Sequence, residues 1–204
     1  MVRPHARTNG VYRVDGERQI LEIAYEQFGT LGFAATSVAA VAEKAGISKP
    51  LIYNYFTSKE GLYEACLDRG GAILAEEIER IAAGDAVGIE RGMQTLGGMF
   101  ALLESQRYLW RLFFDTTAPS TGPIADSIAS YADRIGKLAE EGVAELMALA
   151  DNTDPLDVSA MTTVWLGIVD SLMGWWLEHP DESAEEMMQR CIRLLTALFG
   201  DTSL

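Results

Sequence analysis

Residues 36–60, TSVAAVAEKAGISKPLIYNYFTSKE, constrain the fold most strongly, because they predict two short helices joined by a tight turn. The first helix has one narrow apolar face of small residues at helical spacing, namely Val38, Val41, Ala42 and Ala45. Gly46 follows where the end of a helix favours a left-handed residue, and Ile47 can then enter the core between the two helices. This arrangement is typical of a helix-turn-helix that reads DNA.

The second helix is predicted to begin after Ser48, a good N-cap residue, with Pro50 in its first turn. Since Pro50 has no N–H, we expect the Ser48 hydroxyl to accept a hydrogen bond from the Leu51 N–H. Ile52 and Phe56 lie four residues apart and are predicted to face the core.

The opposite face of this helix is the predicted DNA-reading surface. We expect base edges to be contacted by four residues that form i, i+4 pairs, with Leu51 beside them: Lys49, Pro50, Tyr53 and Asn54. Phosphate contacts are expected from Thr36, Ser37, Ser48, Tyr55 and Lys59. Thr57 and Glu60 form a predicted capping box for a third helix, whose positive N-terminal end suits a phosphate. On spacing alone, an ordinary small helical domain explains the pattern equally well.

Three segments carry a resemblance to a known family: Gly32-Phe33-x-x-Thr36-Ser37, Val41-Ala42-x-x-Ala45-Gly46-Ile47-Ser48-Lys49 and Ile52-Tyr53-x-Tyr55-Phe56-x-Ser58-Lys59-Glu60-x-Leu62. Over residues 18–67 the chain closely resembles the N-terminal DNA-binding domain of TetR-family transcriptional regulators. Pro50 and Leu51 depart from the small residue and the Ser or Thr common there, which bears on the operator sequence rather than the fold. The resemblance implies an all-α protein in which a three-helix DNA-binding domain is joined by a long helix to a helical bundle for ligand binding and dimerisation.

The charge of the chain is divided unevenly. The formal net charge is −14, but residues 1–60 hold seven Lys/Arg against six Asp/Glu, which leaves nine against 24 for residues 61–204. Phosphate contacts supply most non-specific DNA affinity, so an acidic body argues against general nucleic-acid binding. The same division is compatible with a protein whose N-terminal end alone approaches DNA.

Composition predicts a soluble, globular, cytoplasmic protein. The chain has 204 residues and 49% hydrophobic residues, and we find neither the apolar segment of a secretory signal nor an uncharged run long enough for a membrane span. Cys66 and Cys191 are expected to be reduced, buried thiols rather than a redox pair. His5 and His179 have no Cys or His at ligand spacing, so neither a metal nor a cofactor is expected.

The expected organisation has three parts. Residues 1–15 lack periodicity and are predicted to be a flexible arm, either inert or in contact with DNA, followed by a DNA-binding domain at residues 16–62 and an effector-binding and dimerisation domain at residues 63–204. A first amphipathic helix from Arg18 to Gly32 is predicted by Ile20, Ala24, Phe28 and Leu31. A long helix over residues 58–83 follows, in which Gly70 and Gly71 allow either a bend or close packing.

At least five more helical patterns follow, separated near Ser105 and at residues 119–123, 152–155 and 179–181. Large side chains are abundant there and either fill a bulky core or line a cavity. The resemblance favours a pocket for a small, largely apolar effector. Asp170 is the one charge in the apolar run 164–177, where it either orients a polar group of the ligand or is a capped or inter-subunit hydrogen-bonding residue. The candidate pocket residues are Met93, Met99, Phe100, Trp110, Phe113, Phe114, Tyr131, Trp165, Asp170, Met173 and Trp176.

Small residues repeat along the helix that precedes His179, and the last helix carries more apolar surface than one core contact requires. As in the family that the sequence resembles, we expect these two helices to form a homodimer interface, although an intramolecular contact would also use such a surface. The candidate residues are Gly167, Ser171, Gly174, Met188, Ile192, Leu195 and Phe199.

These observations favour a transcriptional regulator that binds a double-stranded palindromic operator as a dimer, with a repressor released by an apolar effector as the leading form. A ligand-binding helical-bundle protein and an activator without inducer release are the alternatives. An enzyme is not expected, because the sequence has no metal pair, no Gly-rich phosphate loop and no His spaced to act with a Ser, a Cys or a carboxylate.

Overall fold

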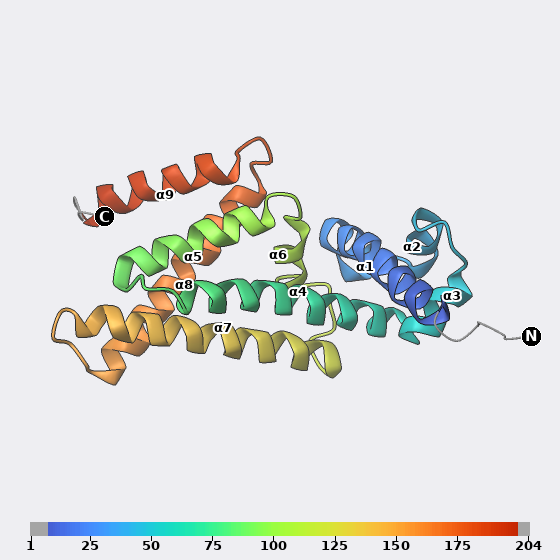
Figure 1. Ribbon diagram of the computed structural model, residues 1–204, viewed down its shortest axis with the longest axis horizontal. Coiled ribbons are helices and arrows are strands. Elements are labelled where there is room, and N and C mark those ends of the chain that lie inside the picture. Colours follow the sequence, from blue (N-terminus) through green and yellow to red (C-terminus); the bar gives the residue numbers. More distant parts are fainter. Residues whose placement is uncertain (1–7, 200–204) are drawn as a thin grey trace, which may run out of the picture. The chain divides into compact units, whose positions relative to one another are not determined.

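The structure, a computed structural model, describes the backbone of residues 8–199 and the side chains of residues 16–197. Within that range the fold is all-α, as predicted (Figure 1). The helices are α1 (Thr8–Ala35), α2 (Val38–Lys44), α3 (Lys49–Phe56), α4 (Lys59–Ala82), α5 (Gly88–Leu103), α6 (Tyr108–Phe113), α7 (Pro123–Ala148), α8 (Pro155–Leu177) and α9 (Ala184–Phe199). The breaks between α5 and α9 fall at the four predicted separators.

The chain forms two compact units. The N-terminal unit contains the chain up to Gly70 together with Tyr108–Ile128, and the C-terminal unit contains Gly71–Arg107 and the chain after Ile128. The division falls inside α4 and α7, so both helices contribute to both units. The boundary expected at residue 62 lies within the N-terminal unit, and α6 belongs to that unit although it is distant in sequence.

α1 begins earlier than expected. It starts at Thr8 rather than Arg18, so residues 8–15 of the expected flexible arm are helical, while residues 1–7 lie outside the described part. No proline interrupts residues 8–18, so the helix continues upstream despite the cost of Gly10 and Gly16. Its core face is formed by Ile20, Ala24 and Phe28 as predicted, but Leu31 is 51% exposed.

α1 is interrupted at Gly32, which has φ 79° and ψ 167°. The positive φ favours glycine, as the predicted helix end requires. Leu31 is the residue directly before this break, and its side chain is exposed rather than in the core. α6 packs against α1 at Gly29, where an added Cβ would lie 2.5 Å from the Tyr108 Cβ.

α4 is continuous from Lys59 to Ala82, and its two central glycines allow close packing. A Cβ on Gly71 would fall 2.6 Å from ring carbons of Tyr131 on α7, and a Cβ on Gly70 would lie 3.7 Å from Leu109 and Phe113. Of the two uses considered for this pair, the packing one is therefore observed.

The core of the C-terminal unit is built from α5, α8 and α9, with α9 lying along α5 (Figure 1). α5 contributes Leu96, Met99 and Phe100, and the Phe100 ring meets the Trp176 ring edge-on at 5.1 Å. Trp176 is fully buried. The core is therefore formed around large aromatic side chains.

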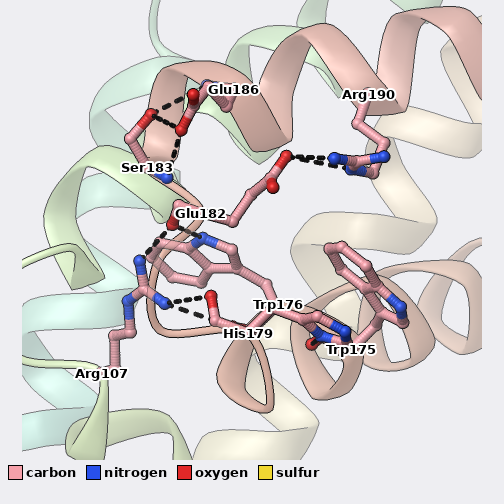
Figure 2. Close-up of polar contacts among 8 residues, drawn as sticks. All are labelled: Arg107, Trp175, Trp176, His179, Glu182, Ser183, Glu186 and Arg190. Atoms are coloured by element: carbon pink, nitrogen blue, oxygen red, sulfur yellow. Dashed lines mark hydrogen bonds and ion pairs between the residues drawn. The ribbon is translucent and has the colours of Figure 1, made fainter.

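Arg107 closes the turn between α8 and α9 (Figure 2). Its guanidinium donates to the carbonyl oxygens of Trp176, His179 and Glu182 and lies 3.8 Å from the centre of the Trp176 ring. The Trp176 indole N–H donates to the same Glu182 carbonyl at 2.9 Å. One cation thus joins three backbone carbonyls, one in the last turn of α8 and two in the segment between α8 and α9.

α8 is the most apolar helix and is mostly exposed. Only Val158, Thr162, Met173 and Trp176 of its 23 residues are buried. By length and composition alone it is apolar enough to cross a membrane, the one such helix among the described residues. An exposed face of this kind is also typical of a helix that packs against another protein chain.

Candidate DNA-binding interface

The turn between α2 and α3 has the predicted geometry. The small face of α2 is buried, with Val41 fully inaccessible, and Gly46 has φ 65°. The Ile47 N–H donates to the Ala42 carbonyl at 3.0 Å, and the Gly46 N–H donates to the Glu43 carbonyl at 3.1 Å. This pair of bonds is a Schellman motif, which fixes the direction in which the chain leaves α2.

α3 packs through the two residues that its periodicity predicts. Ile52 is 0% exposed and Phe56 is 7% exposed. The predicted cap of α3 is wrong in one detail, because the Leu51 N–H donates to the backbone carbonyl of Ser48 and the Ser48 side chain makes no cap bond. With Pro50 supplying no N–H, the turn closes through the backbone, and the exposed Ser48 hydroxyl is left for another acceptor or donor.

The outer face of α3 is accessible to a ligand. Lys49, Pro50 and Asn54 are exposed, and Leu51 and Tyr53 are each 38% exposed. The Lys49 ammonium lies 5.6 Å from the centre of the Tyr53 ring, so the two side chains form a joint cationic and aromatic surface. Tyr55 is half-buried, and its hydroxyl would lie 3.2 Å from a Cβ on Gly16 of α1.

The start of α4 differs from the predicted capping box. Thr57 has φ 65° and ends α3, while the Ser58 hydroxyl accepts a hydrogen bond from the Gly61 N–H at 3.0 Å. Ser58 rather than Thr57 is therefore the N-cap. Gly61 is required here because a Cβ would fall 2.2 Å from the Phe56 carbonyl oxygen.

The candidate phosphate contacts divide into accessible and inaccessible groups. Thr36 is 3% exposed and its hydroxyl donates to the carbonyls of Gln27 and Gly32, so it braces the corner between α1 and α2 and is not available to a phosphate. Ser37 is exposed and caps α2 by accepting from the Ala40 N–H. Lys59 lies beside this corner, with its ammonium 3.5 Å from the Ala34 carbonyl and 4.3 Å from the centre of the Phe33 ring.

One polar cluster in this unit was not found from the sequence. Asp115, which follows α6, accepts hydrogen bonds from the Phe33 N–H at 2.5 Å and from the Thr117 N–H and hydroxyl. The buried Tyr63 hydroxyl lies 2.8 Å from the Leu112 carbonyl and 3.3 Å from Asp115 Oδ2. The only local signal is the Asp-x-Thr spacing, which is typical of an Asx-turn.

The cluster alters the acidity of its members. Burial raises the pKa of the Asp115 carboxyl, but the hydrogen bonds from Thr117, Phe33 and Tyr63 outweigh burial and hold that pKa below its ordinary value. Burial, followed by the neighbouring Asp115 charge, raises the pKa of Tyr63. Asp115 is therefore an anion and Tyr63 a neutral donor near neutral pH.

The candidate effector residues are distributed over both units. Trp110, Phe113 and Phe114 belong to the N-terminal unit, where Trp110 stacks on Phe114 at 5.3 Å. The following candidates are buried core in the C-terminal unit: Met99, Phe100, Met173 and Trp176. Tyr131 lies against Gly71 and Trp165 against Gly92, and Asp170 is exposed.

A groove of about 780 Å³ lies in the C-terminal unit between α4, α5 and α9, and Met93 is the one predicted pocket residue that lines it. Its apolar lining includes Ile81, Met93, Met188 and Ile192, and Gly97 and Gly98 also line it. A bidentate ion pair between Arg80 and Glu77 lies at its edge.

The candidate dimer residues are mainly on exposed surface. Gly167, Ser171 and Gly174 are exposed, and a Cβ on either glycine would meet no atom within 4 Å. Ile192 is 39% exposed and Leu195 is half-buried, whereas Met188 packs toward Gly97. The side chain of Phe199 lies outside the described residues.

Both cysteines are free and buried, and burial raises the pKa of Cys191 to about 11. The described residues contain no group of three or more His, Cys, Asp or Glu side chains arranged to hold a metal ion.

The family model for bacterial regulatory proteins of the tetR family matches residues 20–66, the segment that forms the helix-turn-helix. Residues 20–66 therefore form a DNA-binding domain of the TetR type. TetR-family transcriptional regulators bear this unit at the N-terminus, and the all-α architecture of the remaining chain agrees with that assignment.

The chain is similar in sequence to known transcriptional regulators. The chain is 29% identical to the HTH-type transcriptional activator FasR of Mycolicibacterium smegmatis over 109 residues, covering 53% of this chain and 50% of FasR. It is 28% identical to the probable HTH-type transcriptional regulator ArpR of Pseudomonas putida over 177 residues, covering 80% of each chain. The chain thus spans about half the length of FasR, so the activity of that whole protein does not transfer directly.

The fold of the chain has solved counterparts. The chain is similar in fold to the transcriptional regulator FadR from Bacillus subtilis in complex with stearoyl-CoA, with a TM-score of 0.70 and 17% identity over 90% of this chain and 98% of FadR. At that identity, the likeness concerns the fold alone.

Proposed function

We propose that this TetR-family regulator is a repressor that binds a palindromic operator as a homodimer and is released by a small, largely apolar effector. The observation that carries the DNA-binding part is the exposed outer face of α3, held on the buried pair Ile52 and Phe56 and directed by the Schellman turn at Gly46. In a two-fold dimer, two such helices would enter successive major grooves about 34 Å apart or a multiple of that distance.

The dimer proposal is supported by the exposed face of α8. Met161, Val164, Ile168, Ser171 and Trp175 follow one another at alternating spacings of three and four residues, which is the seam pattern of paired helices. Val164 is 54% exposed, Met161 40% and Trp175 37%. A second copy of the chain would remove this apolar surface from water on both sides at once.

The effector proposal is supported by the groove between α4, α5 and α9. Its volume of about 780 Å³ lies within the usual range for small-molecule sites, and two methionines can adapt to the shape of an apolar ligand. Because Ile81 near the end of α4 lines the groove while Lys59 begins the same helix, α4 connects the proposed effector site with the DNA-contacting side chains. Long-chain acyl-CoAs are the first ligands to test, since FadR of the same fold binds stearoyl-CoA.

The effector must discriminate between two arrangements of the protein. A 100-fold loss of operator affinity requires the effector to prefer the DNA-incompetent arrangement by about 2.7 kcal/mol per dimer. By reciprocity, such an effector binds more weakly when operator is present.

The test is a mobility-shift titration on DNA from upstream of the protein's own gene, with and without each ligand. Release of DNA by a ligand that also raises the melting temperature of the free protein supports the proposal. A ligand that binds equally well with and without DNA contradicts the coupling. The second candidate is an activator, which the similarity to the transcriptional activator FasR favours. A reporter gene whose expression falls when the regulator is deleted would establish it.

A further inference from the structure

The segment between the Gly32 break in α1 and the start of α2 contains backbone N–H groups that need a hydrogen-bond acceptor. The chain breaks at Gly32 and resumes a helical turn at Phe33, closed by the Thr36 N–H donating to the Gly32 carbonyl at 3.2 Å. The N–H groups of Phe33 and Ala34 are therefore at the beginning of a turn, where no helical carbonyl precedes them. They must find acceptors elsewhere or face water.

Both acceptors come from the loop after α6. Asp115 accepts from the Phe33 N–H at 2.5 Å, and the Thr117 hydroxyl accepts from the Ala34 N–H at 3.1 Å. These side chains lie 82 and 83 residues away in the sequence. In ordinary helices a residue next to the helix supplies this cap, so the contact is an N-cap provided by a distant segment.

The loop is itself held in place. The Thr117 hydroxyl donates to Asp115 Oδ1 at 2.6 Å while it accepts from Ala34, which orients both groups. The buried Tyr63 on α4 reaches both the end of α6 and Asp115. Gly32 leaves room for the loop, since a Cβ there would lie 3.0 Å from the Thr117 hydroxyl.

The capped turn adjoins the side chains expected to hold phosphates. Lys59 lies over the Phe33 ring and near the Ala34 carbonyl, and Ser37 directly follows Thr36, whose N–H closes the turn. If this turn opens, Lys59 loses both contacts. Ser37, the N-cap residue of α2, is then no longer held in a fixed position.

We propose that Asp115 and Thr117 are positioning residues for DNA binding, which act by capping the Phe33–Ala34 turn and thereby fixing Ser37 and Lys59. This assignment rests on the proposed DNA-binding function. Asp115 does not contact DNA in this role, and the hydrogen bonds that it accepts stabilise its negative charge.

The test compares Asp115→Asn and Thr117→Val with Asp126→Asn, which removes the same charge from an exposed position in the first turn of α7. Amide hydrogen exchange without DNA should accelerate about tenfold at Phe33 and Ala34 in the first two variants and stay unchanged in the control. Affinity for the upstream DNA fragment retained by the wild type should fall about tenfold.

A role in positioning predicts a change that simple loss of folded protein would not cause. The slope of the logarithm of affinity against the logarithm of salt concentration should become shallower by about one unit, because a phosphate contact is lost. A smaller fraction of folded protein would lower the affinity without changing this slope. Should Asp115→Asn fail to fold, Thr117→Val provides the same comparison.

The outcomes separate the two proposals. Faster exchange at Phe33 with unchanged DNA affinity and salt slope overturns the positioning role, and unchanged exchange overturns the cap itself. A wild-type protein that retards no DNA overturns the proposed function and this positioning role with it, while the exchange measurement still reports whether the cap exists.

Discussion

Gly71 on α4 lies directly against the Tyr131 ring on α7, where a Cβ would fall 2.6 to 2.7 Å from three ring carbons. The two helices are therefore as close at this point as a glycine allows. We expect Gly71→Ala to lower the free energy of unfolding by roughly 1 to 3 kcal/mol, because the ring must move to admit the methyl group. Thermal or urea unfolding measures the change.

The matched control is Gly136→Ala in α7, where an added Cβ meets nothing within 4 Å. Alanine there should raise stability by roughly 0.5 to 1 kcal/mol through helix propensity alone. If both substitutions stabilise the protein, the contact between Gly71 and Tyr131 is not as tight as the structure indicates.

Asp115 should make stability depend on pH in acid. Its pKa is lower in the folded protein than in the unfolded chain, so its contribution is complete above the unfolded value and is lost as pH falls through the folded value. The melting temperatures of wild type and Asp115→Asn should therefore differ most near neutral pH and converge below about pH 4. A difference that stays constant from pH 7 to pH 3 would show that the carboxylate is not responsible.

Tyr25 and Tyr63 differ in whether their hydroxyl groups have a hydrogen-bond partner. Among the described side chains, the Tyr25 hydroxyl is the buried polar group for which no hydrogen-bond partner is found, whereas the Tyr63 hydroxyl bonds to the Leu112 carbonyl. Tyr25→Phe should thus be neutral or stabilising by up to about 1 kcal/mol, while Tyr63→Phe should cost about 1 to 2 kcal/mol. Chemical unfolding of the two variants provides the comparison, and equal losses would indicate a partner for Tyr25.

The α8 surface should determine the oligomeric state. Val164→Glu and Gly174→Trp are expected to convert a homodimer to monomers, because a two-fold contact repeats each substitution on both sides. Val87→Glu is the control, since Val87 is 50% exposed but lies outside α8 and α9. Light scattering at micromolar concentration gives the mass, and a monomeric wild type would exclude the proposed interface.

Substitutions of Asn54 and Lys59 should weaken DNA binding in different ways. Asn54→Ala should weaken operator binding by roughly 1 to 3 kcal/mol and relax one base position, because Asn54 is expected to read a base edge. Lys59→Ala should weaken all sequences alike and flatten the salt slope by about one unit. Titrations on operator and on random DNA distinguish them, and an equal loss on both for Asn54→Ala would refute its assignment.

The sequence predicted the features that depend on neighbouring residues. The burial of Val41, Ala42, Ile52 and Phe56 and the left-handed Gly46 follow from helical spacing and from backbone conformation, both of which are local. The breaks between the later helices were located by their proline and polar residues for the same reason.

Features that depend on distant contacts were missed or misplaced. The cap from Asp115 to Phe33 joins residues 82 positions apart, and no local sequence pattern predicts it. Ser58 replaces Thr57 as the N-cap because Thr57 is used to end α3. Phe100 and Trp176 were candidate pocket residues and are buried in the core. The sequence could not separate the two cases, because hydrophobic periodicity is the same for a packed interior and for the wall of a cavity.

The central claim is that the outer face of α3 reads DNA, and selection of genomic fragments by the purified protein tests it most directly. The bound fragments are sequenced for the wild type and for a variant carrying Lys49→Ala, Tyr53→Ala and Asn54→Ala, three exposed positions that leave Ile52 and Phe56 in place. We predict that the wild type enriches fragments sharing an inverted repeat, with half-site centres about 10 base pairs or a multiple apart, and that the variant enriches none. The same fragments enriched by both proteins, or no shared repeat with the wild type, would contradict the claim.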